Sequence, residues 1–272
     1  MPGRCYRGRL KGGKVLEISI NGKLYAAAAG EKILEVARRN KILIPTLCHS
    51  EALPGSASCR LCVVELHKEG EVQFVAACSH PVSEGMVVQT ESQALSANRR
   101  RLLQLYQLMA PDSSRIKNLL AVYQGEPLTR LTADTDNKCI LCGLCVRACD
   151  QLGTSAISTV FRGTHKKIDT AFAQPPVACI GCGACYNVCP VDAIAMEDQL
   201  GQRRIWQKSF ELVRCASCGE YYTTREAQAF LQHKLGDQGV DLELCDCCKA
   251  RRTAEKYRDG LHLLEIYNIP QG

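Results

Sequence analysis

The sequence lacks several features that define common classes of protein. It contains no run of 18 consecutive apolar residues, which argues against a membrane-spanning helix. It has no G-x-G-x-x-G after a predicted strand and no P-loop, so we expect no dinucleotide or nucleoside triphosphate site. Aromatic residues are only 6% of the chain and are sparsely interleaved with basic ones, which disfavours a nucleic-acid-binding face.

The N-terminal stretch MPGRCYRGRLKGGK also lacks the apolar core of a secretion signal. We therefore expect a cytoplasmic protein whose 18 cysteines stay reduced rather than forming disulfides. The formal charge of +6 counts every cysteine as neutral, whereas metal-bound thiolates carry negative charge. The assembled protein should thus be closer to neutral, and the charge gives little support to nucleic-acid binding.

The most specific pattern lies between Cys139 and Pro190. Two cysteine runs in it have the spacing C-x2-C-x2-C-x3-C, which is typical of a ferredoxin with two [4Fe-4S] clusters. Turn-prone Gly143, Gly181 and Gly183 separate the cysteines where the backbone must wrap around a cluster. Disulfides and zinc are the alternatives, but eight cysteines in two copies of this spacing favour iron and sulfide.

The same motif predicts which cysteines share a cluster, because the fourth cysteine of each run ligates the other cluster in two-cluster ferredoxins. We therefore assign one [4Fe-4S] centre to Cys139, Cys142, Cys145 and Cys189, and the second to Cys179, Cys182, Cys185 and Cys149. Between the runs, residues 153–176 have two β-rich halves around Arg162-Gly163, which predict an inserted hairpin.

The N-terminal part predicts a β-grasp domain with a [2Fe-2S] cluster. Residues 14–25 form an expected hairpin with its turn at Asn21-Gly22. A helix over residues 31–40 and a strand over residues 42–44 should follow. The next four cysteines supply the number of thiolates that a [2Fe-2S] cluster needs: Cys48, Cys59, Cys62 and Cys78. A zinc site is the alternative.

The stretch PTLCHSEALPGSASCRLCVVEL, residues 45–66, resembles a known N-terminal domain. It is shared by the large iron-sulfur subunit of respiratory complex I, iron-only hydrogenases and the diaphorase iron-sulfur subunit of NAD-linked hydrogenases. The resemblance covers residues 13–198 and implies that the four N-terminal cysteines bind one [2Fe-2S] cluster. In complex I, one histidine and three cysteines in the following interval hold a further [4Fe-4S] cluster. Residues 98–138 contain neither residue type, so we expect that cluster to be missing.

Two helices are predicted in this interval. In residues 91–109, Leu95, Leu102, Tyr106 and Met109 have helical spacing, which leaves the basic triplet at residues 99–101 in solvent. A second helix should run over residues 113–123, with Asp112 or Ser113 as its N-cap. The helical scaffold should therefore persist without the extra cluster.

The C-terminal part carries two further C-x2-C pairs, Cys215 with Cys218 and Cys245 with Cys248, on either side of a predicted helix over residues 223–235. We interpret the four as a zinc-ribbon-like site. Their separation of 26 residues exceeds the usual ribbon gap and Cys247 offers a fifth thiolate, so a third [4Fe-4S] cluster is the alternative. Cys5 and Cys247 are interpreted as unliganded thiols. Residues 249–256 predict a basic, solvated helix.

These patterns predict an α+β chain with four parts. They are a [2Fe-2S] ferredoxin-like domain at 13–90, a helical linker at 91–137, a two-[4Fe-4S] ferredoxin domain at 138–198 and a zinc-ribbon-like module with four cysteine ligands at 210–260.

The expected function follows from the clusters, which exchange single electrons. No residues suit acid-base catalysis, so we predict a subunit that is not catalytic by itself. The resemblance implies a hetero-oligomer in which it joins a flavin- and NAD(P)-binding subunit to a catalytic metal-bearing subunit, such as a hydrogenase or formate dehydrogenase. The alternative function is a redox-responsive regulator that uses its zinc module to bind nucleic acid or protein.

Overall fold

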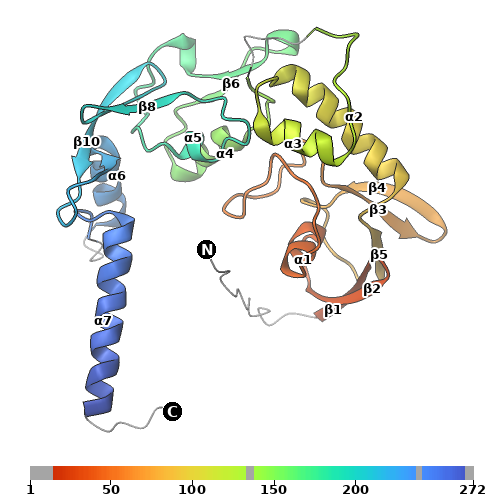
Figure 1. Cartoon of the computed structure of the whole chain (residues 1–272), viewed down its shortest axis with the longest axis horizontal. Helices are drawn as coiled ribbons and strands as arrows, with labels where there is room; N and C mark the ends of the chain where they lie inside the picture. Colours follow the sequence, from red (N-terminus) through yellow and green to blue (C-terminus); the bar gives the residue numbers. More distant parts are fainter. Residues whose placement is uncertain (1–14, 133–137, 237–240, 267–272) are drawn as a thin grey trace.

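The computed structural model describes residues 15–132, 138–236 and 241–266, with side chains up to residue 258 (Figure 1). Cys5 lies outside the described residues. In chain order the elements are β1 (Val15–Ile20), β2 (Lys23–Ala28), α1 (Ile33–Arg39), β3 (Val63–Lys68), β4 (Glu71–Ala76), β5 (Met86–Gln89), α2 (Gln93–Met109), α3 (Ser114–Val122), α4 (Leu144–Leu152), β6 (Ser158–Val160), η1 (Gly163–His165), β7 (Lys167–Asp169), η2 (Ala171–Ala173), α5 (Ala184–Asn187), β8 (Met196–Gln199), β9 (Gln202–Ile205), β10 (Lys208–Arg214), β11 (Tyr221–Thr224), α6 (Arg225–Leu235) and α7 (Asp246–Ile266).

The N-terminal strands form one mixed sheet in the order β2-β1-β5-β3-β4. The predicted hairpin is confirmed as β1 and β2, and its turn residues Asn21 and Gly22 both have positive φ. Strand β5 lies parallel to β1 and antiparallel to β3. The predicted helix is confirmed as α1, whose apolar face joins the core of this sheet through Ile33, Leu34 and neighbouring residues.

The strand predicted over residues 42–44 is wrong, because this segment is irregular. Lys41 has φ of 60°, which turns the chain sharply after α1, and Pro45 follows directly. Only Ile44 is buried, while Leu43 is 88% exposed. The apolar, β-branched composition favours a strand, but none of the strands in the described part of the chain pairs with this segment. The segment instead leads into the loop that carries Cys48.

Helices α2 and α3 confirm the two predicted helices. The hydroxyl of Ser92 accepts a hydrogen bond from the backbone N–H of Leu95 and caps α2, and Ser113 caps α3 in the same way. The buried face of α3, which includes Ile116 and Leu120, packs in one apolar core with residues around Cys48 and Cys142. The helical segment therefore packs against both the N-terminal and the central cysteine sites.

The prediction that the whole basic triplet on α2 faces solvent is wrong for Arg99, which is only 1% exposed. Its guanidinium donates to the backbone carbonyls of Leu61, Val63 and Thr90 at 3.0–3.2 Å. Buried carbonyls need donors, and these three end up beside α2 through tertiary packing that helical periodicity does not reveal. Arg99 thus fixes α2 to the segment around Cys62, because Leu61 and Val63 lie on either side of that cysteine.

The second half of the chain is built from short elements around the central cysteines. The predicted inserted hairpin is confirmed as the two-stranded sheet β6-β7. A four-stranded antiparallel sheet in the order β11-β10-β9-β8 then leads to the C-terminal part. The predicted helix over residues 223–235 is confirmed as α6, and the predicted basic helix as the start of α7, whose residues 251–258 are exposed.

Figure 1 shows the N-terminal sheet and α7 on opposite sides of the molecule, with α4 and α5 between them and α7 extending away from the other elements. Among the helices of the described residues, none combines the length and apolar character needed to cross a membrane.

The environment of Arg99 predicts a large stability effect. We expect Arg99→Met to lower the free energy of unfolding by about 3 kcal/mol, because three buried carbonyls lose their donor and each costs roughly 1 kcal/mol. The matched control is Arg101→Met on the same helix, which is exposed and should change stability by less than about 0.5 kcal/mol. Anaerobic urea unfolding followed by circular dichroism measures both. Equal effects of the two substitutions would contradict the structure.

Candidate metal centres

The four N-terminal cysteines form one buried site. Cys48, Cys59 and Cys62 lie on the loop before β3, and Cys78 follows β4; each is at most 3% exposed. The thiols of Cys48 and Cys59 contact each other, as do those of Cys62 and Cys78. The backbone N–H groups of Cys59 and Leu47 donate to the sulfurs of Cys48 and Cys59 at 3.3 and 3.4 Å. The site is therefore two pairs of sulfur atoms with backbone donors around them.

Each pair separates the pKa values of its two thiols. Contact with the Cys59 thiol lowers the pKa of Cys48 to about 5, and contact with Cys62 lowers the pKa of Cys78 to about 7. The same contacts, with burial, raise the pKa of Cys59 and of Cys62. Metal binding requires deprotonated thiols, and one thiol of each pair already has a lowered pKa.

The loop between Cys48 and Cys59 folds tightly over the site. An ideal Cβ on Gly55 would lie 2.1 Å from the carbonyl oxygen of Cys78, so only glycine fits there. Ala57 has φ of 53°, which adds a second sharp bend. His49 follows Cys48, and burial lowers its pKa. We interpret His49 as a neighbour of the site.

The central cysteines line two separate cavities. The first cavity is lined by Cys139, Cys142, Cys145 and Cys189 among other residues. The second is lined by Cys149, Cys179, Cys182 and Cys185. Each cavity combines three cysteines of one run with the fourth of the other run, which is the grouping that the sequence predicts.

Helix α4 produces this exchange of cysteines. It begins after Gly143, whose φ is 72°, and it carries both Cys145 and Cys149. These two residues lie one helical turn apart, yet one lines the first cavity and the other lines the second. Helix α5 begins in the same way after Gly183, whose φ is 75°. The repeated motif therefore folds twice into the same loop and helix start.

The central thiols are partly buried and surrounded by N–H donors. Burial raises the pKa of Cys142 to about 11 and that of Cys145 to about 12. Backbone N–H groups donate to the sulfurs of Cys139, Cys149 and Cys189 at 3.2–3.3 Å. Such donors stabilise negative charge on thiolates that hold a metal cluster.

Two cations near the second cavity are not apparent from the cysteine motif. Arg203 on β9 donates to the carbonyl of Gly181 at 3.1 Å, and Lys208 on β10 donates to the carbonyl of Cys179 at 2.9 Å. Both come from strands that follow the motif, so only the tertiary fold brings them to its loop. The basic residues within positions 202–208 were the available signal in the sequence.

Arg147 joins the N-terminal site to the first central cavity. It lies on α4 between Cys145 and Cys149, and its guanidinium donates to the carbonyls of Cys48 and Pro54 at 2.7 and 2.5 Å. Cys48 and Cys142 also belong to the same apolar core. The two sites are therefore packed against each other through this side chain and a shared apolar core.

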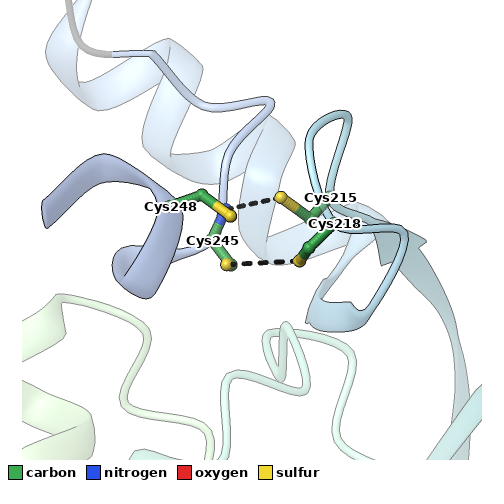
Figure 2. A group of neighbouring side chains, drawn as sticks. All are labelled: Cys215, Cys218, Cys245 and Cys248. Carbon is green, nitrogen blue, oxygen red and sulfur yellow. Dashed lines mark hydrogen bonds between the residues drawn. The ribbon is translucent and has the colours of Figure 1, made fainter. Parts of the chain in front are cut away.

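The four C-terminal cysteines meet at one point, although their two pairs are far apart in the sequence (Figure 2). Cys215 and Cys218 lie in the turn between β10 and β11, and Cys245 and Cys248 lie at the start of α7. All four sulfur atoms lie within 4.8 Å of one another, and those of Cys218 and Cys245 are 3.8 Å apart. Cys247 is exposed and is not part of this group.

Backbone donors also surround the C-terminal sulfurs. The N–H groups of Cys218 and Cys245 lower the pKa of Cys215 to about 6. Arg251 donates to the sulfur of Cys248 at 3.5 Å. This arrangement suits a metal ion held by thiolates.

Comparison with known proteins defines the class of this chain. Residues 13–93 match the 2Fe-2S iron-sulfur cluster binding domain, and residues 133–196 match a 4Fe-4S dicluster domain. A further 4Fe-4S dicluster domain model matches residues 178–220. The chain is therefore a mixed α+β iron-sulfur protein with an N-terminal 2Fe-2S domain followed by 4Fe-4S domains.

Individual relatives make the resemblance specific. The chain is 29% identical over 231 residues to an NADH-quinone oxidoreductase subunit of Rhizobium meliloti (strain 1021), a match that covers 75% of this chain and 27% of that protein. It is 30% identical over 217 residues to the NADP-reducing hydrogenase subunit HndD of Solidesulfovibrio fructosivorans, covering 68% and 37%. The resemblance to complex I and hydrogenase iron-sulfur subunits is thus confirmed. The chain spans about a quarter to just over a third of the length of these relatives.

A solved structure agrees with this resemblance. A chain in the crystal structure of an NAD+-reducing [NiFe]-hydrogenase in the H2-reduced state superposes with a TM-score of 0.52 and 26% sequence identity. The match covers 65% of this chain and 86% of that chain. The likeness therefore extends to the fold of most of the hydrogenase chain.

Gly55 provides a test of the N-terminal site. We expect Gly55→Ala to remove about two irons per chain and the [2Fe-2S] signal in electron paramagnetic resonance, because its Cβ would collide with the backbone at Cys78. The [4Fe-4S] signals should remain. The control is Gly70→Ala at the β3-β4 turn, where no atom lies within 4 Å of the added Cβ and only φ strain is introduced. An intact [2Fe-2S] signal in Gly55→Ala would contradict the tight loop.

Proposed function

We propose that the chain is an electron-transfer subunit of a multisubunit oxidoreductase, with one [2Fe-2S] and two [4Fe-4S] clusters as its electron carriers. The observation that carries this proposal is the series of adjacent cysteine sites. Arg147 and a shared core join the N-terminal site to the first central cavity, and α4 supplies ligands to both central cavities. Adjacent cysteine-ligated clusters favour single-electron transfer with little rearrangement.

We assign the ligands from the same geometry. The [2Fe-2S] cluster has two irons with two thiolates each, and the paired thiols suit one iron held by Cys48 and Cys59 and the other by Cys62 and Cys78. The two [4Fe-4S] clusters take the cysteines that line the two central cavities, namely Cys139, Cys142, Cys145 and Cys189 for the first and Cys149, Cys179, Cys182 and Cys185 for the second.

The proposed division of the chain follows these sites. Residues 13–90 would form a β-grasp [2Fe-2S] domain, which the mixed five-stranded sheet with α1 against it supports. Residues 91–137 would be the helical linker, 138–198 the two-cluster domain and 210–260 the zinc-ribbon-like module. We also place the protein in the cytoplasm, because cluster ligands must remain reduced thiols.

We propose zinc rather than a third cluster at the C-terminal cysteines. A tetrahedral zinc ion with Zn–S bonds of about 2.3 Å places its sulfurs about 3.8 Å apart. The Cys218 and Cys245 sulfurs have a separation of 3.8 Å. A [4Fe-4S] cluster would need wider spacing, because four irons and four sulfides lie between its cysteine sulfurs. The zinc would be structural. Its ligand Cys215 directly follows strand β10, and the same strand supports the second [4Fe-4S] loop through Lys208.

Metal content tests these assignments. We expect about ten irons and one zinc per chain in anaerobically purified protein, from one [2Fe-2S] cluster, two [4Fe-4S] clusters and one zinc. Cys245→Ser should lose the zinc and keep the irons, and the control Cys247→Ser should lose neither. About fourteen irons without zinc would refute the zinc proposal, and iron-free protein would refute the electron-transfer function.

Partners test the role in a complex. We propose a flavin- and NAD(P)-binding subunit on one side and a catalytic metal-bearing subunit on the other, which the names of the NADH-quinone oxidoreductase and NADP-reducing hydrogenase relatives support. The tagged chain, purified anaerobically from its native cells, should retain a flavoprotein and a second metal-bearing subunit. Retention of DNA in their place would favour the redox-responsive regulator.

A further inference from the structure

Trp206 occupies a position that none of the assigned sites explains. It is the single tryptophan of the chain and lies in the turn between β9 and β10. Trp206 is a lining residue of both central cavities, the one with Cys145 and the one with Cys185. It also packs on the apolar core that contains Ile205 and Phe210. One residue therefore borders two proposed cluster sites at once.

The indole ring also makes a directed contact with one of the two sites. Its Nε1–H donates to the sulfur of Cys185 at 3.4 Å. Cys185 belongs to the second cavity, so the donor serves that cavity although the residue lines both. A hydrogen bond to a ligand sulfur stabilises the more negatively charged, reduced form of a cluster and raises its reduction potential.

The backbone at this turn holds Trp206 in an unusual conformation. Trp206 and Gln207 have φ of 51° and 59°. A two-residue hairpin turn with two positive φ angles normally contains Asn-Gly or similar residues, as Asn21 and Gly22 do between β1 and β2. Large side chains in this conformation cost free energy and persist where the surrounding structure fixes them, often at functional sites. The turn therefore presents the indole ring to the cavities in spite of this cost.

We propose that Trp206 is a positioning residue that sets the two [4Fe-4S] clusters at different potentials and shields both from water. The proposal rests on the proposed function, because it requires clusters at the two cavities. The N–H donor raises the potential of the second cluster relative to the first. The bulk of the ring covers both.

The test uses the full chain purified anaerobically with its clusters. Trp206→Phe keeps an aromatic ring but removes the N–H donor. Because the N–H···S bond is stronger to the reduced cluster, its loss should change the reduction equilibrium of the second cluster about fivefold, which is about 40 mV at 59 mV per tenfold for one electron. We expect the potential of one [4Fe-4S] signal to fall and that of the other to stay, as measured by redox titration with electron paramagnetic resonance.

A matched control removes a donor at another site. Tyr106→Phe deletes a hydroxyl that donates to the carbonyl of Cys59 at 3.1 Å, and it should leave both [4Fe-4S] potentials unchanged. Trp206→Leu, which also removes the covering ring, should lose cluster absorbance in air faster than Trp206→Phe. Iron content separates a failure of the proposed function from a failure of the role of Trp206. Wild-type protein without [4Fe-4S] clusters would refute the proposed function, whereas intact clusters with unchanged potentials in Trp206→Phe would refute only the role of Trp206.

Discussion

Burying so many cysteine sulfurs is favourable only if their charge and lost solvation are compensated. Burial raises the pKa of central thiols such as Cys142 and Cys145, so their thiolates are unfavourable unless a metal is bound. Backbone N–H groups point at many of these sulfurs and supply part of the compensation. Positive φ angles occur at Leu141, whose own N–H is one of these donors, and at Ser155, directly before the Ala156 donor. Folding of these loops and metal binding are therefore coupled.

Arginine and lysine side chains extend the same principle to the junctions between sites. Arg99 and Arg147 donate to carbonyls on the loop of the N-terminal cysteines, from α2 and α4 respectively. Arg203 and Lys208 do so at the second central loop. Each cation satisfies backbone oxygens that the irregular loops cannot pair internally. Each also places positive charge near a site where bound clusters would be negative. Of the four, Arg147 links two cysteine sites, and the other three fasten a neighbouring helix or strand to a cysteine loop.

Two incorrect expectations, the strand over residues 42–44 and the solvated position of Arg99, have a common cause. Composition predicts the first and helical spacing predicts the second, and both signals are local. The outcome depends on partners far along the chain: within the described ranges no strand pairs with Ile42, and three carbonyls lie beside Arg99. The Asn21-Gly22 turn and the Ser113 cap are confirmed, because their outcome depends only on residues next to them in the chain.

The iron-sulfur character of the protein can be read directly from the chain, because ligand spacing is a local property that the C-x2-C-x2-C-x3-C runs display. Periodicity and turn residues likewise indicate the order of the helices and hairpins. The three-dimensional fold was needed to learn how Cys215 meets Cys245, how Arg147 links the N-terminal and central sites, and why Trp206 faces both cavities. These contacts join residues that are distant in the chain, and local sequence patterns carry no information about their geometry.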